Sequence, residues 1–258
     1  MNELRITLIQ ANLIWQNPAA NRDYFSSTFA TLQGKTDLVI LPEMFTTGFS
    51  MQPELHAESF EGETIQWLKQ QASLLKAAIC GSLATQIETG FVNRFTFVTP
   101  EGEVLYYDKH HLFRMSPEPE HYQAGQERKI FTYQGWRILP QVCYDLRFPV
   151  FMRNRNDYDF AIVVANWPEP RRMAWRTLLQ ARAIENLSYV VGVNRVGQDG
   201  SGLNYTGDSL VVNFKGELLL DQAPSTPFVE TRTLSLEALN QFKTQFPAWR
   251  DANEFELK

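Results

Sequence analysis

A glutamate, a lysine and a cysteine each follow a segment that is typical of a β-strand. The strand-like segments are 38–41, 104–107 and 137–142, and the residues that follow them are Glu43, Lys109 and Cys143. A thiol becomes a strong nucleophile when a nearby base takes its proton, and a carboxylate can act as that base. A lysine can stabilise the oxyanion that forms when a thiol attacks a carbonyl carbon. Brought together, the three groups could perform nucleophilic catalysis at such a carbon.

The two cysteines of the chain have different surroundings in the sequence. Cys80 lies inside the apolar segment 77–81, which predicts a side chain in the hydrophobic core. Cys143 lies where apolar sequence changes to a tyrosine, an aspartate and an arginine, which predicts the end of a strand and the start of a turn. We therefore interpret Cys143 as the candidate nucleophile.

Short apolar strands alternate with amphipathic helices along the chain, and this predicts an α/β fold in which helices cover the sheets. Helices are predicted at 19–32, 63–75, 171–186 and 236–246. Strands are predicted at 6–11, 38–41, 77–84, 91–98, 104–107, 137–142, 160–165, 189–193, 209–212, 218–220 and 228–233. A turn at 100–102 joins two of them into a hairpin, so the sheets should be mixed.

Two of the predicted helices have residues at helical spacing on one face. These residues are Ile65, Leu68, Ala72 and Leu75 in the first case, and Ala174, Leu178, Ala181 and Glu185 in the second. The last predicted helix has Leu236, Leu239, Phe242 and Phe246 on one face, which could serve the core or an interface. No linker or internal repeat divides the chain, so a single domain over residues 1–258 is expected.

The composition excludes several classes of protein. With 24 Lys and Arg against 29 Asp and Glu, the net charge is −5, which disfavours a nucleic-acid partner. The longest apolar runs are far shorter than the ~20 residues that span a bilayer, so no membrane segment is expected. Two cysteines without a targeting segment indicate a reduced, cytoplasmic setting.

The sequence disfavours a metal site. The candidate ligands that lie close together in the sequence are Asp108, His110, His111, Glu118 and His121. His110 and His111 are adjacent, so on a strand their side chains would point in opposite directions. The chain also has no Cys-x-x-Cys pair and no phosphate-binding glycine motif. The segment 198–202 is more typical of a mobile loop.

Three motifs in this order resemble those of the nitrilase superfamily of carbon–nitrogen hydrolases. They are Leu-Pro-Glu at 41–43, Lys-His-His-Leu-Phe at 109–113 and Cys-Tyr-Asp-Leu-Arg-Phe-Pro at 143–149. The segments 6–11, 166–168, 181–186 and 207–209 extend the resemblance over nearly the whole chain. The forms at 109–115 and 143–149 look most like those of bacterial ω-amidases.

The resemblance implies a four-layer α-β-β-α sandwich with mixed sheets, a homodimer, and no metal or organic cofactor. The expected partner is a small-molecule amide substrate. The implied activity is hydrolysis of the ω-amide of short α-keto dicarboxylic acid monoamides, such as 2-oxoglutaramate, to the keto acid and ammonia. The resemblance also implies a role for each of three residues. Glu43 is the general base and acid, Lys109 stabilises the oxyanion, and Cys143 is the nucleophile that forms a thioester.

Two further residues should support this chemistry. Family members carry a supporting glutamate near the position of Glu118, seven residues before Gly125, and Glu120 is the alternative. The backbone N–H of Tyr144, directly after the nucleophile, is the natural second donor to the oxyanion.

A keto-acid amide carries a carboxylate, so its pocket should contain a cation. The candidate substrate-binding residues are Phe113, Arg147, Trp167, Arg171 and Arg172. The two aromatic residues are expected as walls, and the three arginines as readers of the carboxylate. Arg147 could instead pair with Asp145 or Glu185.

Three other interpretations stay open. The same Glu-Lys-Cys site could serve an N-carbamoyl amidase or a nitrilase. A non-catalytic interaction module of the same fold is a second possibility, and a thiol hydrolase with His110 or His111 as the base is a third. Pro140 departs from the pattern, because proline lacks an N–H, so the strand before Cys143 is expected to be irregular or unpaired there.

Overall fold

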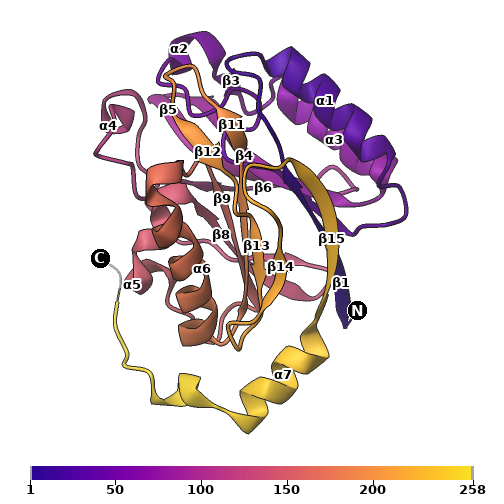
Figure 1. Cartoon of the computed structure of the whole chain (residues 1–258), viewed down its shortest axis with the longest axis vertical. Helices are drawn as coiled ribbons and strands as arrows, with labels where there is room; N and C mark the ends of the chain where they lie inside the picture. Colours follow the sequence, from indigo (N-terminus) through magenta and orange to yellow (C-terminus); the bar gives the residue numbers. More distant parts are fainter. Residues whose placement is uncertain (1, 257–258) are drawn as a thin grey trace.

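Two β-sheets lie face to face between layers of helices in the computed structural model, which describes residues 2–256 (Figure 1). The first sheet has the order β15 (Phe228–Ser235), β1 (Glu3–Gln10), β2 (Leu38–Ile40), β4 (Ala78–Ile87), β5 (Gly90–Val98) and β6 (Val104–Asp108), and β3 (Glu58–Ser59) pairs with β4. The second has the order β14 (Leu218–Asp221), β13 (Leu210–Val212), β10 (Tyr189–Asn194), β9 (Phe160–Ala165), β8 (Trp136–Val142) and β7 (Phe131–Tyr133). A hairpin of β11 (Val196–Gln198) and β12 (Asn204–Thr206) stands apart from both.

The helices form the two outer layers. Against the first sheet lie α1 (Pro18–Ala30) and α3 (Glu63–Leu75), side by side, and against the second lies α6 (Arg172–Asn186) (Figure 1). The chain ends with α7 (Leu236–Gln245) and a 3-10 turn, η3 (Ala248–Asp251). The remaining short elements are α2 (Pro53–His56), α4 (Glu118–His121), η1 (Cys143–Arg147), α5 (Pro149–Met152) and η2 (Glu169–Arg171).

Three clusters of buried side chains hold the layers together. One lies between the sheets and includes Cys80, one joins the first sheet to α1 and α3, and one joins the second sheet to α6. Both sheets contain parallel and antiparallel pairs. The expected α-β-β-α sandwich with mixed sheets is therefore confirmed.

The predicted faces of the helices are correct for one helix and wrong for another. All four predicted residues of α3 are buried. In α6 the buried residues are instead Trp175, Leu179, Arg182, Ala183 and Asn186, while Glu185 is exposed. The predicted face is displaced by one residue, because the buried face includes the large side chains of Trp175 and Arg182. The Trp175 indole donates to the Asp208 carbonyl and the Arg182 guanidinium to the Leu146 carbonyl, so both can be buried.

Pro140 interrupts the second sheet less than expected. The parallel register of β8 and β9 runs through Pro140 without a shift, so the strand is regular on that side. On the other side, pairing with β7 reaches only Ile138 in the part of the chain that the structure describes. The expected irregularity at Pro140 was thus wrong for the edge of β8 that pairs with β9 and confirmed for the edge that faces β7.

The segment expected as a mobile loop at 198–202 is the turn of the β11–β12 hairpin. The Asp199 carboxylate holds it, because it accepts hydrogen bonds from the N–H groups of Ser201 and Leu203 and from the hydroxyls of Ser201 and Tyr205. Such Asx-type bonds order a turn that the sequence alone shows only as a polar, glycine-rich stretch.

Candidate active site

Four strands end at one place between the two sheets. In the first sheet β2 and β4 are parallel, and β5 runs against both β4 and β6, so β6 points the same way as β2. Glu43 follows β2 and Lys109 follows β6. In the second sheet β8 and β9 are parallel and are followed by Cys143 and Asn166. Parallel strands end at the same edge, which is where α/β folds form their ligand sites.

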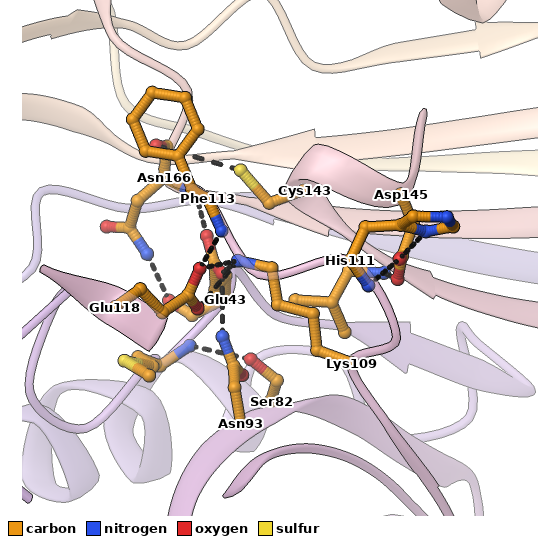
Figure 2. Close-up of polar contacts among 12 residues, drawn as sticks. Glu43, Ser82, Asn93, Lys109, His111, Phe113, Glu118, Cys143, Asp145 and Asn166 are labelled. Carbon is orange, nitrogen blue, oxygen red and sulfur yellow. Dashed lines mark hydrogen bonds and ion pairs between the residues drawn. The ribbon is translucent and has the colours of Figure 1, made fainter. Parts of the chain in front are cut away.

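Glu43 is completely buried and its carboxylate accepts three hydrogen bonds (Figure 2). Oε1 accepts from Asn93 Nδ2 at 2.8 Å and from Lys109 Nζ at 3.1 Å, and Oε2 accepts from the Asn166 N–H at 2.7 Å. The Asn166 amide also donates to the Glu43 carbonyl at 2.6 Å. Donors from three different elements therefore fix the position of this carboxylate.

Lys109 lies between two carboxylates (Figure 2). Its ammonium group is 3.1 Å from Glu43 Oε1, and 2.8 and 3.0 Å from the two oxygens of Glu118, and all three side chains are fully buried. Burial alone would lower the pKa of Lys109, but the nearby Glu118 and Glu43 carboxylates outweigh it and raise this pKa above its ordinary value. Lys109 is therefore a fixed positive charge.

Glu118 comes from the first turn of α4, and its carboxylate faces Lys109. Its Oε2 also accepts from the Phe113 N–H at 2.5 Å, which ties α4 to the loop after Lys109. Burial raises the pKa of Glu118 even though Lys109 opposes this shift. The alternative, Glu120, is exposed to solvent.

Cys143 has a left-handed backbone conformation, with φ of 48°. Such a conformation costs a residue other than glycine about 1–3 kcal/mol. Cys143 directly follows β8 and lines a cavity, and its Sγ lies 4.0 Å from the Asn166 carbonyl oxygen. Burial and the Glu43 carboxylate raise the pKa of Cys143, and Lys109 only partly offsets them. A raised pKa favours the protonated thiol form of Cys143.

Neither neighbouring histidine faces Cys143. His111 bonds to the Asp145 carboxylate through Nδ1 at 2.8 Å and stacks on Phe148. His110 lies near the Gly125 carbonyl and stacks on Phe151. A Cys–His pair would lower the pKa of the thiol, whereas that of Cys143 is raised. The geometry thus disfavours a histidine base.

The cavity beside Cys143 has a volume of about 570 Å³. Tyr144 and four of the five predicted substrate-binding residues line it: Phe113, Arg147, Trp167 and Arg171. Arg172 does not, because its guanidinium is held by Asp208 at 2.7 and 2.9 Å. Further walls that the sequence did not predict come from Trp15, Phe49, Met51, Met115 and Tyr205.

Two arginines in this wall stack on aromatic rings. Arg147 lies 4.9 Å from the Trp167 ring and Arg171 lies 5.0 Å from the Phe113 ring. Within residues 2–256 neither forms a salt bridge, so the alternative partners of Arg147 are excluded: Asp145 accepts from Tyr107 and His111, and Glu185 pairs with Arg182. Both guanidinium groups are free to meet an anion.

Three polar residues around Glu43 were missed as site residues. Asn93 and Asn166 donate to Glu43, and the Ser82 hydroxyl accepts from the Met44 N–H at 2.9 Å (Figure 2). The available signal was a polar residue inside an apolar strand, as Asn93 is within 91–98, because a buried amide needs partners.

Two negative findings concern the described residues 2–256. They contain no group of three His, Cys, Asp or Glu side chains arranged to hold a metal ion. None of their helices combines the length and the apolar character that crossing a membrane requires.

Comparison with known proteins gives consistent matches over the chain. The family model for carbon–nitrogen hydrolases matches residues 5–244. Omega-amidase YafV of Escherichia coli (strain K12) is 48% identical over 257 residues, with 100% of both chains covered. A 2-oxoglutaramate amidase of Paenarthrobacter nicotinovorans is 34% identical and covers 84% of this chain and 79% of its own. The crystal structure of XC1258 from Xanthomonas campestris, a CN-hydrolase superfamily protein, has a TM-score of 0.97 and 48% identity, with 100% of both chains covered.

Proposed function

Because the chain belongs to the carbon–nitrogen hydrolase family of the nitrilase superfamily, we propose that it is a cysteine-dependent ω-amidase. It is a hydrolase of carbon–nitrogen bonds, and its relatives support an amidase. The proposed substrates are short α-keto dicarboxylic acid monoamides such as 2-oxoglutaramate. The observation that carries the proposal is the buried Glu43–Lys109–Glu118 cluster, which is hydrogen-bonded to Asn166, a residue that lines a cavity together with Cys143, Arg147 and Arg171.

The reaction begins with transfer of the Cys143 proton to Glu43 as Sγ attacks the amide carbon. The resting thiol makes this transfer necessary, since its raised pKa leaves little thiolate at neutral pH. Lys109 and the Tyr144 N–H stabilise the oxyanion of the tetrahedral intermediate. Glu43 then gives the proton to the leaving nitrogen, so that ammonia departs and a thioester remains on Cys143.

Hydrolysis of the thioester uses the same groups, with water in place of the thiol as the attacking nucleophile. Glu43 takes a proton from water as the oxygen attacks the thioester carbon. Collapse of the second tetrahedral intermediate breaks the carbon–sulfur bond and releases the keto acid. The proton returns from Glu43 to the Cys143 sulfur, which restores the thiol.

The test is ammonia release from 2-oxoglutaramate, glutamine, a carbamoyl amino acid and a simple nitrile. Fast release from the keto-acid amide alone, lost in Cys143→Ala, is the expected result. Release from the carbamoyl compound or the nitrile instead would replace the proposed substrate with one of the alternative activities. Absence of any Cys143-dependent release across the panel and related amides would favour the non-catalytic module.

Glu118→Gln should lower kcat by at least about tenfold while the protein still folds. Glu118 provides two of the three carboxylate contacts that hold the Lys109 ammonium, and a hydrogen bond to a charged group contributes about 1.5–3 kcal/mol. Steady-state kinetics and thermal melting measure the two effects. Glu120→Gln, at the exposed neighbour on the same helix, is the matched control. Turnover near the wild-type rate in Glu118→Gln would remove this residue from the mechanism.

Arg171→Met and Arg147→Met should each raise KM for 2-oxoglutaramate more than KM for a neutral amide of similar length. A charge-assisted contact between guanidinium and carboxylate contributes about 1.5–3 kcal/mol, so the arginine that reads the carboxylate should change KM by roughly 10- to 100-fold. Arg172→Met is the control, because Asp208 holds that side chain outside the cavity lining. Equal effects on charged and neutral amides would show that neither arginine recognises the carboxylate.

We also propose that the protein is a cytoplasmic homodimer. Both cysteines are free, which fits a reduced compartment. Met173 and Ile184 lie eleven residues apart on one side of α6 and are 79% and 52% exposed, and Val150 on α5 is 57% exposed. Light scattering measures the mass in solution, and a monomer at micromolar concentration would contradict the dimer.

A further inference from the structure

We propose that Asn93 is a positioning residue that orients the Glu43 carboxylate so that only its Oε2 oxygen can take the proton of Cys143. The inference rests on the proposed function, because it concerns the base of that reaction. Asn93 lies near the start of β5, which runs opposite to β6 and so begins at the edge where Lys109 lies. Its side chain is completely buried and does not line the cavity.

The hydrogen bonds distinguish the two oxygens of Glu43 (Figure 2). Each carboxylate oxygen has two lone pairs. Oε1 receives two donors, Asn93 Nδ2 at 2.8 Å and Lys109 Nζ at 3.1 Å, so both of its lone pairs are used. Within residues 2–256, Oε2 receives one donor, the Asn166 N–H at 2.7 Å. The remaining lone pair on Oε2 is the one that can accept a proton.

Asn93 also positions Lys109, through its backbone. The Lys109 N–H donates to the Asn93 carbonyl at 2.9 Å, one residue beyond the last β5–β6 pair, Arg94 with Asp108. The side chain of Asn93 therefore holds the base, and its main chain holds the residue that stabilises the oxyanion. A shift of this one residue would move both groups.

Packing alone does not explain an asparagine at this position. Asn93 Oδ1 is buried and has no hydrogen-bond partner among the described residues. A buried amide oxygen without a partner costs about 1–3 kcal/mol, whereas a leucine of similar size would carry no such cost. The Asn93 amide therefore lowers the stability of the fold, and the hydrogen bond that its side chain does form is the one from Nδ2 to Glu43.

The test compares Asn93→Leu and Asn93→Asp with the wild type in ammonia release from 2-oxoglutaramate. We expect kcat to fall about 10- to 100-fold, as for loss of one hydrogen bond to a charged group, with KM unchanged. Asn93→Asp keeps the shape and can donate only when protonated, so its activity relative to the wild type should recover as the pH falls. Thr96→Val, a buried change on β5 away from Glu43, is the matched control.

The inference is overturned by a folded Asn93→Leu protein with wild-type kcat, or by a folded Asn93→Asp protein whose activity relative to the wild type does not rise as the pH falls. A rise in KM with kcat unchanged would also overturn it, because a positioning residue for the base acts on the chemical step. If Asn93→Leu does not fold, Asn93→Asp alone decides. Glu43→Gln is measured in parallel to separate this inference from the proposed function. If Glu43→Gln is inactive, the proposed function stands whatever the result for Asn93. If Glu43→Gln turns over at the wild-type rate, Glu43 is not the base and the proposed function fails.

Discussion

Cys143→Ala is expected to lower ammonia release by at least about 10⁴-fold, to the level of the uncatalysed reaction in the assay. Without Sγ no thioester can form, and Glu43 and Lys109 have no covalent intermediate to act on. The thiol lies at the cavity wall on a left-handed turn, so alanine removes only one atom from a site that is otherwise unchanged. Stopped-assay ammonia measurement with 2-oxoglutaramate gives the ratio.

Cys80→Ala is the matched control for this change. Cys80 lies in the core between the two sheets, and burial raises the pKa of its thiol. Its substitution should lower the melting temperature and leave kcat unchanged. Normal turnover in Cys143→Ala would overturn the covalent mechanism, and loss of turnover in both variants would point to a folding defect.

Alkylation gives a second measurement on the same residue. The pKa of Cys143 is raised by burial and by Glu43, so iodoacetamide should react slowly at neutral pH and faster as the pH rises. In Glu43→Gln one of these two causes is removed, and the reaction should be faster at a given pH. A rate that is already maximal at neutral pH would indicate a thiolate, and with it an ion-pair mechanism.

The strands and helices were predictable from local pattern, whereas the four layers and the joint role of Glu43, Lys109 and Cys143 came from the resemblance to the nitrilase superfamily. The predicted bounds of the apolar strand 160–165 and of the amphipathic helix 63–75 match the observed ones, since burial on both sides leaves a continuous apolar run and burial on one side leaves a clear period. Glu43, Lys109 and Cys143 each follow such a strand, so their common location follows from the topology of parallel strands.

The sequence could not predict contacts that depend on where hydrogen-bond partners lie in space. Arg172 was an equal candidate with Arg171, and only the position of Asp208, 36 residues away, separates them. Asn93 was visible only as a polar residue within the strand 91–98, and its role was not, because its partner Glu43 lies 50 residues earlier in the chain. The aromatic walls at Trp15 and Tyr205 come from opposite ends of the sequence and meet only in the fold.

Lys109→Met is expected to remove activity and to destabilise the fold. Loss of one donor to an oxyanion lowers kcat by about 10²–10³-fold. The same change leaves the Glu43 and Glu118 carboxylates buried without their cation, and breaking a buried ion pair by removal of one partner costs about 3–5 kcal/mol. Lys35→Met, an exposed lysine on the surface, is the control and should change neither quantity. Kinetics and urea unfolding measure the two effects.

The stability of Lys109→Met should depend on pH with a defined sign. Two buried carboxylates without a cation cannot both stay ionised, so the folded variant holds a proton that the unfolded chain releases above about pH 4.3. The folded state then binds more protons than the unfolded state, and the free energy of unfolding falls as the pH rises from that value. The double variant Lys109→Met/Glu118→Gln removes one of the two charges, so it should unfold at higher urea concentration than Lys109→Met at neutral pH and lose most of this pH dependence. If the double variant is no more stable than the single one, the loss of stability comes from packing around the lysine stem and not from the uncompensated carboxylates.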